Sequence, residues 1–390
     1  MDRNSKGRIV VLHLAARYPF AGVVWQLLHH LIGFRELGFD VYYIEDHRAY
    51  CYDPVEFTIT RDPSRNLRML GGVLERYGFA GRWAFLDSAR EEYVGMPRER
   101  CLELIRGADA VINLCGATEP REEHRESRCL VYLETDPGAF QVEYARKIAL
   151  VREFASAHTL FFTYAANIGA ADCKLPAAGI DWHTTRPPVL LEDWRPGVGP
   201  AQPRAFTTVG TWRNTGSDLV IGGDTYYWSK HVNFQKMLEV ARRAAQPIEI
   251  ATDLKSGPDY DAALAGGFSI VPVTPMSLDI DTYRNYISAS RGEFTVAKDI
   301  YARTRSGWFS DRTVCYLAAG RPVVTQRTGF EKFVPEGLGL LGFDTADEAV
   351  DAIGRINAGY ARHARAAREI AAEYFGAAKL LGEIAGVIGV

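Results

Sequence analysis

The sequence lacks the features of a membrane or secreted protein. Its 390 residues contain no run of about 20 apolar side chains, the length that a helix needs to cross a bilayer. Residues 1–8 are polar, and the apolar run at 9–14 has no small-residue cleavage site, so no signal peptide is predicted. The six cysteines are scattered without a CxxC pair, which argues against a disulfide framework or a zinc site. We therefore expect a cytoplasmic protein with reduced cysteines and no integral membrane segment.

An excess of charge of one sign is also missing. The chain has 45 Lys and Arg against 48 Asp and Glu, a formal net charge of −3. A nucleic-acid binder or a polybasic membrane anchor would need a basic excess. The loop after the first apolar run, AARYPFAG at 15–22, contains no GxGxxG, which disfavours a nicotinamide-dependent dehydrogenase. No DxD-type pair or His/Asp cluster stands out either, so we expect no nucleic-acid partner, no metal and no cofactor.

An alternation of strand-like and helix-like segments is present throughout the chain. Residues 8–13 form a near-continuous apolar run, typical of a strand buried on both faces of a parallel sheet. Residues 24–37 repeat at helical spacing, and 40–44 are again strand-like. The further predicted strands are 109–114, 129–133, 159–163, 205–209, 247–251, 268–271, 293–296 and 322–325. The further predicted helices are 98–106, 140–154, 233–244, 281–288, 310–319, 346–357 and 360–376.

Proline separates two such series. Five prolines lie within residues 186–204, a density that neither a helix nor a central strand can accommodate. The predicted fold class is therefore α/β, with two Rossmann-like doubly wound domains facing across a cleft. We place the domains at 1–190 and 200–375, and expect a C-terminal helix at about 376–390 to pack back on the first domain.

Loops at strand ends of the second domain point to a phosphate. Ligands of open α/β sheets bind outside the carboxyl ends of the strands, where the loops 210–213, 305–312 and 326–330 are expected. Ser310 or Asp311 can cap a helix whose free N–H groups suit an anion. A nucleoside diphosphate brings about two negative charges, more than one helix end can balance. Cations are therefore needed, and the candidates are Arg213, Lys230, Lys298 and Arg312, with solvated surface charges as the alternative for each.

One segment resembles a known family. Residues 306–329, SGWFSDRTVCYLAAGRPVVTQRTG, resemble the carboxy-terminal segment of GT-B-fold glycosyltransferases of the group 1 and CgeB-like superfamily. The resemblance implies a metal-independent transferase with an acceptor-side domain at 1–190 and a nucleotide-sugar-binding domain at 200–375. A UDP-sugar is the favoured donor, and a small molecule or glycan would supply the acceptor hydroxyl. The implied donor sugar or ribose contacts are Thr328, Gly329, Phe330 and Glu331.

The first loop adds to the resemblance, whereas a missing acid pair departs from it. The segment PFAGVVWQ at 19–26 is similar to the superfamily's first loop, which places four residues at the acceptor cleft: Phe20, Gly22, Trp25 and Gln26. Many retaining members carry two glutamates eight residues apart, where this chain has Gly307 and Cys315. Whether the anomeric centre is inverted or retained is therefore left open, and the sequence does not predict an oligomeric state.

A glycosyl transfer with inversion needs a base for the acceptor hydroxyl. His13 ends the first predicted strand, and Glu134 and Asp136 follow another in LETDPG, so these three are the catalytic candidates. The alternatives are a core histidine and an aspartate that caps a turn. Two other functions fit the same architecture: a nucleotide-sugar epimerase, and a two-lobed ligand-binding protein that is not an enzyme.

Overall fold

The structure is built around two β-sheets. It is a computed structural model in which residues 5–195, 203–244 and 246–390 are described. In spatial order the first sheet contains β10 (Trp182–Thr184), β9 (Leu160–Thr163), β8 (Leu130–Glu134), β7 (Ala110–Leu114), β1 (Arg8–Leu12), β2 (Asp40–Glu45), β5 (Trp83–Asp87) and β6 (Glu92–Gly95). The second contains β15 (Phe268–Pro272), β14 (Ile248–Thr252), β11 (Phe206–Val209), β16 (Gly292–Thr295), β17 (Val323–Gln326) and β18 (Leu340–Phe343).

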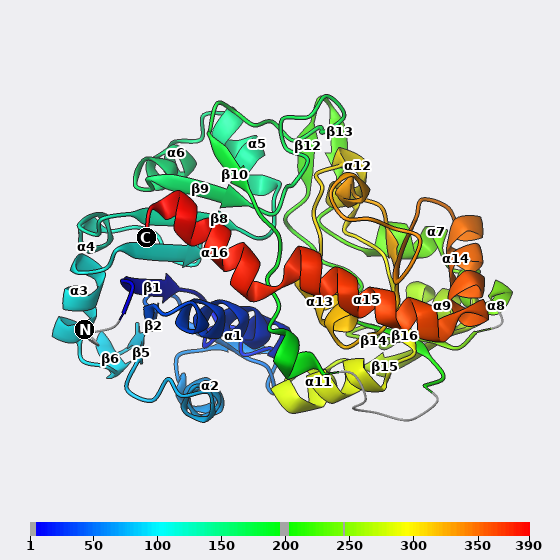
Figure 1. Cartoon of the computed structure of the whole chain (residues 1–390), viewed down its shortest axis with the longest axis horizontal. Coiled ribbons are helices and arrows are strands. Elements are labelled where there is room, and N and C mark those ends of the chain that lie inside the picture. Colours follow the sequence, from blue (N-terminus) through cyan, green and yellow to red (C-terminus); the bar gives the residue numbers. More distant parts are fainter. Residues whose placement is uncertain (1–4, 196–202, 245) are drawn as a thin grey trace.

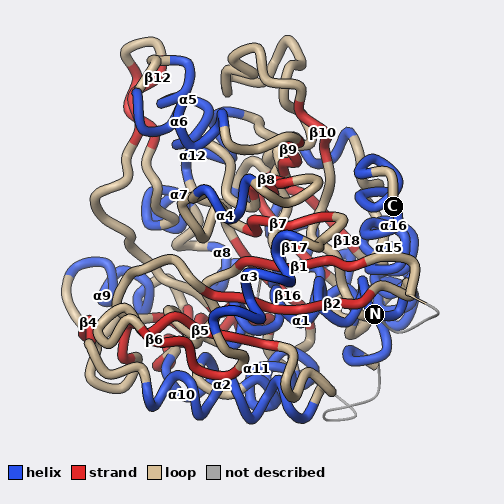
Figure 2. The backbone as a smooth tube through the Cα atoms, turned by 90° about the vertical axis from the view of Figure 1, so that its left-hand side faces the viewer, coloured by secondary structure: helices blue, strands red, loops and turns tan. Residues whose placement is uncertain are grey.

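Both sheets have the doubly wound pattern. Neighbouring strands are parallel except for β5 and β6, which are antiparallel. Figure 2 shows the strands of the first sheet stacked in the order given. The strand order reverses at β1, which pairs with β2 and β7, and at β11, which pairs with β14 and β16. Loops diverge at such points and leave a crevice for a ligand. Two small hairpins lie outside the sheets: β3 (Cys51–Asp53) with β4 (Thr58–Thr60), and β12 (Leu219–Ile221) with β13 (Asp224–Tyr226).

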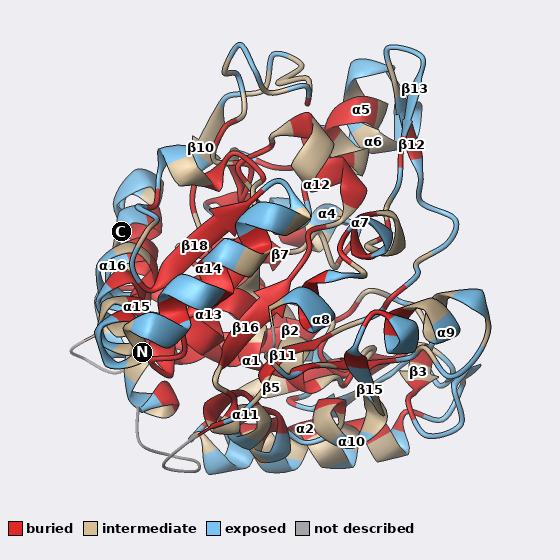
Figure 3. Ribbon diagram, turned by 90° about the vertical axis from the view of Figure 1, so that its right-hand side faces the viewer, coloured by how far each residue is buried: buried red, intermediate tan, exposed pale blue. Residues whose placement is uncertain are grey.

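Helices cover the sheets and bury one face each. Those of the first half of the chain are α1 (Ala21–Glu36), α2 (Ser64–Arg76), α3 (Arg98–Arg106), α4 (Glu122–Arg125), α5 (Ala139–Ala145) and α6 (Ala149–Ser156). Those of the second half are α7 (His231–Lys236), α8 (Val240–Arg243), α9 (Pro258–Ala265), α10 (Thr274–Ser277), α11 (Ile280–Ala289), α12 (Asp299–Thr304), α13 (Asp311–Ala318), α14 (Ala346–Ala358), α15 (Tyr360–Phe375) and α16 (Ala377–Ile388). Short 3-10 helices lie at Leu191–Trp194 and Phe330–Lys332. In α14 the buried residues are Ala349, Ala352, Ile353 and Ile356, a helical spacing, and Figure 3 shows its outer face exposed beside buried strands.

Two predicted helices are broken in the structure. The helix expected at 140–154 is divided into α5 and α6 at Lys147, whose φ of 62° is left-handed and ends a helix. The helix expected at 233–244 is divided into α7 and α8 by a short turn in which the Met237 N–H donates to Phe234 and the Val240 N–H to Met237. Apolar spacing continues across both breaks, so the periodicity could not reveal them.

The chain crosses between the two halves twice, and the crossings touch. Val189, on the way out, forms a parallel bridge with Gly376, on the way back, and the Val189 N–H donates to the Phe375 carbonyl at 2.8 Å. Beyond the bridge, α16 lies along α1 of the first half, as Figure 1 shows for the red and blue helices. Of the proline-rich stretch expected as the domain boundary, residues 196–202 lie outside the described residues.

A glycine allows the close approach of α16 to α1. A Cβ atom at Gly33 would lie 2.4 Å from Leu381 Cδ1, so a larger residue forces the helices apart. Gly33→Leu should destabilise the protein by about 1–3 kcal/mol through overpacking. The control is Gly72→Leu in α2, where nothing lies within 4 Å and the better helix former should stabilise slightly. Melting temperatures that move alike in both variants would contradict this packing.

Candidate active site

A buried carboxyl group ends β8 at the carboxyl edge of the first sheet. Glu134 Oε2 accepts hydrogen bonds from the Thr163 hydroxyl, at 2.7 Å, and from the Gln141 amide, whereas its Oε1 is buried without a partner. Burial raises the pKa of Glu134 to about 7, although the two hydrogen bonds oppose the shift. A group with such a pKa can take up and release a proton at neutral pH.

Asp136 lies two residues further on and bridges the two halves of the chain. Its Oδ1 accepts hydrogen bonds from Lys298, at 3.0 Å, and from the Tyr301 hydroxyl, both at the start of α12. Desolvation opposes ionisation, but Lys298 and Tyr301 outweigh it and lower the pKa of Asp136. Asp136 is therefore an ionised partner of Lys298. This contact goes beyond the alternative role of capping a turn, which its position before Pro137 suggested.

A cluster of buried polar side chains joins the two halves beside these carboxyl groups. His13 Nε2 lies 3.0 Å from Gln26 Oε1, and the Cys115 thiol donates to the same oxygen at 3.2 Å. The Gln26 amide also hydrogen-bonds the carboxyl group of Asp311, at the start of α13. His13 Nδ1 and Asp311 Oδ1 are buried without partners. The ends of β1 and β7 thus meet the first turn of a helix from the second half.

Burial changes the proton affinity of both ends of this cluster. It lowers the pKa of His13 to about 3 and raises the pKa of Asp311 to about 7. A histidine with that pKa is neutral at physiological pH and a weak base. His13 therefore fits the alternative of a hydrogen-bonded core histidine better than the predicted catalytic role, and Glu134 is the better candidate for the base.

Two cations converge on Gly210 at the carboxyl end of β11. A Cβ atom there would lie 3.4 Å from Lys230 Nζ and 3.5 Å from Arg312 Nη1. The Arg312 Nε donates to the buried Glu293 at 2.6 Å, which offsets one of the two charges. The Lys230 side chain makes no hydrogen bond or ion pair with the described residues, and burial, followed by the charge of Arg312, lowers its pKa well below the usual value. With Lys230 protonated, the site has a net positive charge beside bare backbone, which suits a phosphate group.

The start of α13 adds backbone donors near the same cations. Ser310 is the N-cap residue of the helix, but its side chain makes no capping hydrogen bond, and the Asp311 carboxyl group is hydrogen-bonded to Gln26 and to its own N–H. The next two N–H groups of α13, those of Arg312 and Thr313, lack a side-chain acceptor and can bind an anion. Arg312, in the first turn, is fixed by donating to the Val209 carbonyl at 2.8 Å besides Glu293.

The other two predicted phosphate ligands are engaged elsewhere. Arg213 pairs with Asp259 of α9 at 2.7 Å and is half-exposed. The preceding Trp212 stacks on Phe234 in the core, at 4.5 Å between ring centroids, and this turns the next residue outward. Lys298 is paired with Asp136, so a phosphate would have to displace that carboxylate. Of the predicted cations, the structure brings together Lys230 and Arg312.

The four residues expected to hold the donor sugar or ribose make internal contacts. The Thr328 hydroxyl donates to a backbone carbonyl, and Phe330 is buried in the core. Both oxygens of Glu331 are occupied, one by Arg305 and the other by the N–H of Gly329 at 3.0 Å. The cavity beside Thr328 and Phe330, which Ser310 and Arg312 also line, has about 10 Å³ in this structure, room for one water molecule. Thr328 and Phe330 are buried and Glu331 is paired with Arg305, so we do not include these residues in the proposed site.

Three of the four predicted acceptor-cleft residues lie in other contacts. Trp25 is buried, and its indole N–H donates to the Ile280 carbonyl of α11 at 3.0 Å, so it joins the two halves. Gly22, one turn earlier in α1, also faces α11. Phe20 is half-buried against Tyr52, at 5.8 Å between ring centroids. Gln26 is the one of the four that reaches the polar cluster.

A cavity of about 340 Å³ opens at the two carboxyl groups, with Glu134, Asp136, Cys115 and Trp228 in its lining. It lies at the carboxyl end of β8, where ligands of open α/β sheets bind.

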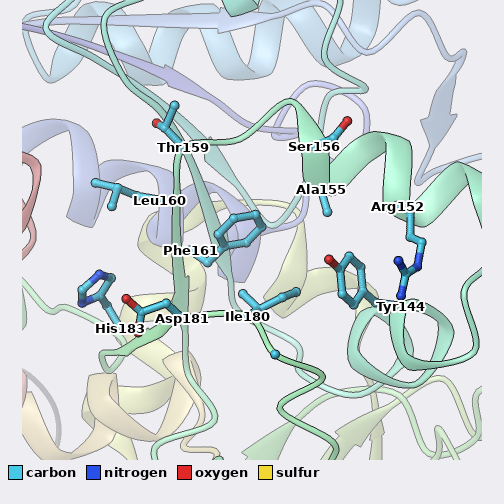
Figure 4. A pocket seen from close by; sticks show the side chains of 11 residues that line it. Tyr144, Arg152, Ala155, Ser156, Thr159, Leu160, Phe161, Ile180, Asp181 and His183 are labelled. Carbon is cyan, nitrogen blue, oxygen red and sulfur yellow. The ribbon is translucent and has the colours of Figure 1, made fainter.

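Two further cavities lie at sheet edges. One has about 500 Å³, and Figure 4 shows Tyr144 and Arg152 on one side of it and His183 on the other. Thr159, which also lines it, precedes β9, so this cavity is at the amino end of the strand. The other has about 520 Å³ and is lined by charged side chains around β5 and β6. Neither lies at the carboxyl end of β8, where Glu134 and Asp136 meet the second half.

Some residues of the site were not predicted. Thr163 and Gln141 hold Glu134, and the Tyr164 hydroxyl is buried without a partner, with its pKa raised by burial and by the nearby Asp311. Threonine, glutamine and tyrosine carry no marker of such roles in one sequence. Glu293 could have been noticed in the sequence, because it is a charged residue within an apolar strand and such a residue needs a partner.

The described residues contain neither a cluster that could hold a metal ion nor a helix that could span a membrane. Within residues 5–195, 203–244 and 246–390, no group of three or more His, Cys, Asp or Glu side chains is placed to hold a metal ion. Across the same ranges, no helix has the length and apolar character needed to span a membrane.

Comparison with known proteins identifies the fold. No family model and no curated protein matches the sequence. Among solved structures, an alpha-glucosyltransferase in complex with UDP matches with a TM-score of 0.60 at 12% identity, over 99% of this chain and 100% of its own. AviGT4, a glycosyltransferase involved in avilamycin A biosynthesis, matches with 0.57 at 11% identity, over 98% and 97%. HepE of Anabaena, in complex with UDP and glucose, matches with 0.55 at 13% identity, over 98% and 99%. The chain has the GT-B fold of these glycosyltransferases, which confirms the predicted fold class.

Proposed function

We propose that this chain is a metal-independent glycosyltransferase that moves a sugar from a nucleoside-diphosphate sugar, with a UDP-sugar favoured, to a hydroxyl group. The observation that carries the proposal is that cations of the second half, Lys298 and Lys230, lie close enough to Asp136 of the first half to lower its pKa. Lys230 and Arg312 converge on Gly210 in the second half, and Glu134 and Asp136 end a strand of the first half. The UDP complexes of two structural neighbours support the choice of nucleotide.

In the proposed reaction the acceptor oxygen bonds to the anomeric carbon as the bond from that carbon to the β-phosphate oxygen breaks. The departing diphosphate gains negative charge, which Lys230 and the N–H groups of Arg312 and Thr313 stabilise. The proton of the acceptor hydroxyl passes to Glu134, whose pKa of about 7 suits a base. Residues 1–190 would thus hold the acceptor, and 200–375 the nucleotide sugar.

Nucleotide binding tests this proposal. A ligand at about 100 times its Kd stabilises a protein by about 2.7 kcal/mol, enough to raise the melting temperature measurably. We expect UDP to give a larger rise than GDP, dTDP, ADP or NAD, and EDTA to leave that rise unchanged. Uridine is the control, because it lacks the phosphates that Lys230 would contact. If none of the diphosphates raises the melting temperature, or if only NAD does, the glycosyltransferase proposal fails. If EDTA abolishes the rise given by UDP, nucleotide binding requires a metal ion and the proposal of metal independence is wrong.

A further inference from the structure

One wall of the cavity at Glu134 is aromatic and apolar. Tyr132 lies 4.9 Å from Phe140 and 5.2 Å from Phe154 between ring centroids, and all three residues line the cavity. Gly116 approaches these rings so closely that a Cβ atom would lie 3.0 Å from Tyr132. The wall therefore consists of aromatic side chains and the backbone of Gly116.

This wall continues to the surface. Leu150, at the start of α6, lines the cavity and has 76% of its surface exposed. Ile148, two residues earlier, is also exposed, and Val151 lines the cavity as well. A single exposed leucine needs no explanation. Apolar side chains that run from solvent to a cavity containing a candidate base are different, because contiguous apolar surface at a cavity marks a ligand site.

The polar part of the lining is acidic. Glu119 and Glu143 line the cavity in addition to Glu134 and to Asp136, which is paired with Lys298; no Lys, Arg or His is among the lining residues themselves. Neither the Glu119 nor the Glu143 carboxylate has a hydrogen bond or ion pair to the residues that the structure describes. An anionic ligand would meet uncompensated negative charge at close range, which disfavours its binding.

We propose that this cavity binds the acceptor and that the acceptor is an alcohol or phenol with an apolar ring body and no negative charge. The inference rests on the proposed function, which supplies the donor. The hydroxyl group of the acceptor lies at Glu134, which takes the proton, and the rings of the acceptor pack against Tyr132 and Phe140. Ligand cavities usually have about 300–1,000 Å³, so 340 Å³ accommodates a few fused rings. A neighbouring alpha-glucosyltransferase has been solved with UDP-glucose and DNA, and a duplex is too large and too anionic for this cavity.

Binding of matched probes tests the acceptor class. With UDP present, 2-naphthol should bind at least tenfold more tightly than 6-hydroxy-2-naphthoate, which has the same rings and one carboxylate, and than glucose. Leu150→Asp should weaken 2-naphthol binding about tenfold, since it puts a charge where apolar contact is lost. Leu264→Asp is the control, because Leu264 is also exposed but lies on α9. The double variant Glu119→Gln, Glu143→Gln should improve naphthoate binding at least tenfold.

The outcomes separate this inference from the proposed function. If UDP binds but 2-naphthol and larger ring alcohols do not, the acceptor class is wrong and the transferase proposal stands. The acceptor class is also wrong if Leu264→Asp acts as strongly as Leu150→Asp, or if glucose, the naphthoate or duplex DNA binds best. Acyclic farnesol binding as tightly as 2-naphthol would overturn the ring requirement. If UDP itself does not bind, the proposed function fails, and the acceptor inference, which rests on it, is overturned with it.

Discussion

Replacing Glu134 by Gln should lower kcat by about 100- to 10,000-fold and leave UDP affinity nearly unchanged. Glutamine keeps the size of the side chain, and its carbonyl oxygen can still accept the hydrogen bond of the Thr163 hydroxyl, now 2.7 Å from Glu134. The amide cannot take up a proton, so the loss falls on the chemical step. Initial rates with a UDP-sugar and 2-naphthol, together with UDP titration, measure the two effects separately.

The pH profile provides a second signature of the same residue. The pKa of Glu134 is raised to about 7, so the group is mostly protonated at pH 6 and mostly ionised at pH 8. Because the ionised form is the base, kcat/KM of the wild type should rise with pH through about 7 and then level off. Glu134→Gln should flatten this rise. The exposed Glu153 of α6 is the control, and Glu153→Gln should retain both rate and profile.

Stability should change in the same variant with a definite sign. The folded pKa of about 7 lies above the ordinary value of 4.5, so the folded protein binds this proton more tightly than the unfolded chain. The free energy of unfolding therefore falls as the pH rises between these two values. Glu134→Gln should remove that fall and be more stable than the wild type at pH 8. If the variant retains the rate and the rise near pH 7, the base is another group, and Asp311, whose pKa is also raised to about 7, is the next to test.

The elements predicted correctly were those that one local pattern determines. A continuous apolar run followed by helical spacing indicated β1, α1 and β2, because parallel strands are buried on both faces. The break between α5 and α6 depends on a left-handed Lys147, a conformation that lysine does not favour and that apolar spacing cannot indicate. Fold-level reasoning therefore worked where the signal extends over many residues and failed at single turns.

In the candidate site, too, some features could be predicted from the sequence and others could not. The rule that ligands meet carboxyl strand ends selected Glu134 and Asp136, because strand ends can be read from the sequence. Partner choice could not be read, since it depends on packing: Trp212 enters the core and turns Arg213 toward Asp259, and Trp25 packs between the halves. The opposite pKa shifts of His13 and Glu134 arise from burial and neighbours, which a single sequence does not report.

Replacing Lys230 by Met should weaken UDP binding about 30-fold, since a lost charged hydrogen bond is worth about 2 kcal/mol. Methionine keeps the length of the side chain and removes the charge. Arg312→Ala is a poorer test, because the buried Glu293 would lose its partner, a change that costs about 3–5 kcal/mol of stability. Isothermal titration with UDP and with uridine measures the effect, and uridine affinity should stay unchanged.

The same variant should be more stable than the wild type when no ligand is bound. Burial and Arg312 lower the pKa of Lys230, which means that its charged form is disfavoured in the folded protein and that Met removes this cost. For the same reason UDP affinity of the wild type should decline toward alkaline pH as Lys230 loses its proton, and the decline should vanish in Lys230→Met. Arg213→Met, at the half-exposed arginine paired with Asp259, is the control and should leave UDP affinity unchanged. Weaker UDP binding together with lower stability would instead assign Lys230 a structural role. Weaker UDP binding together with higher stability is the result expected if Lys230 binds a phosphate group.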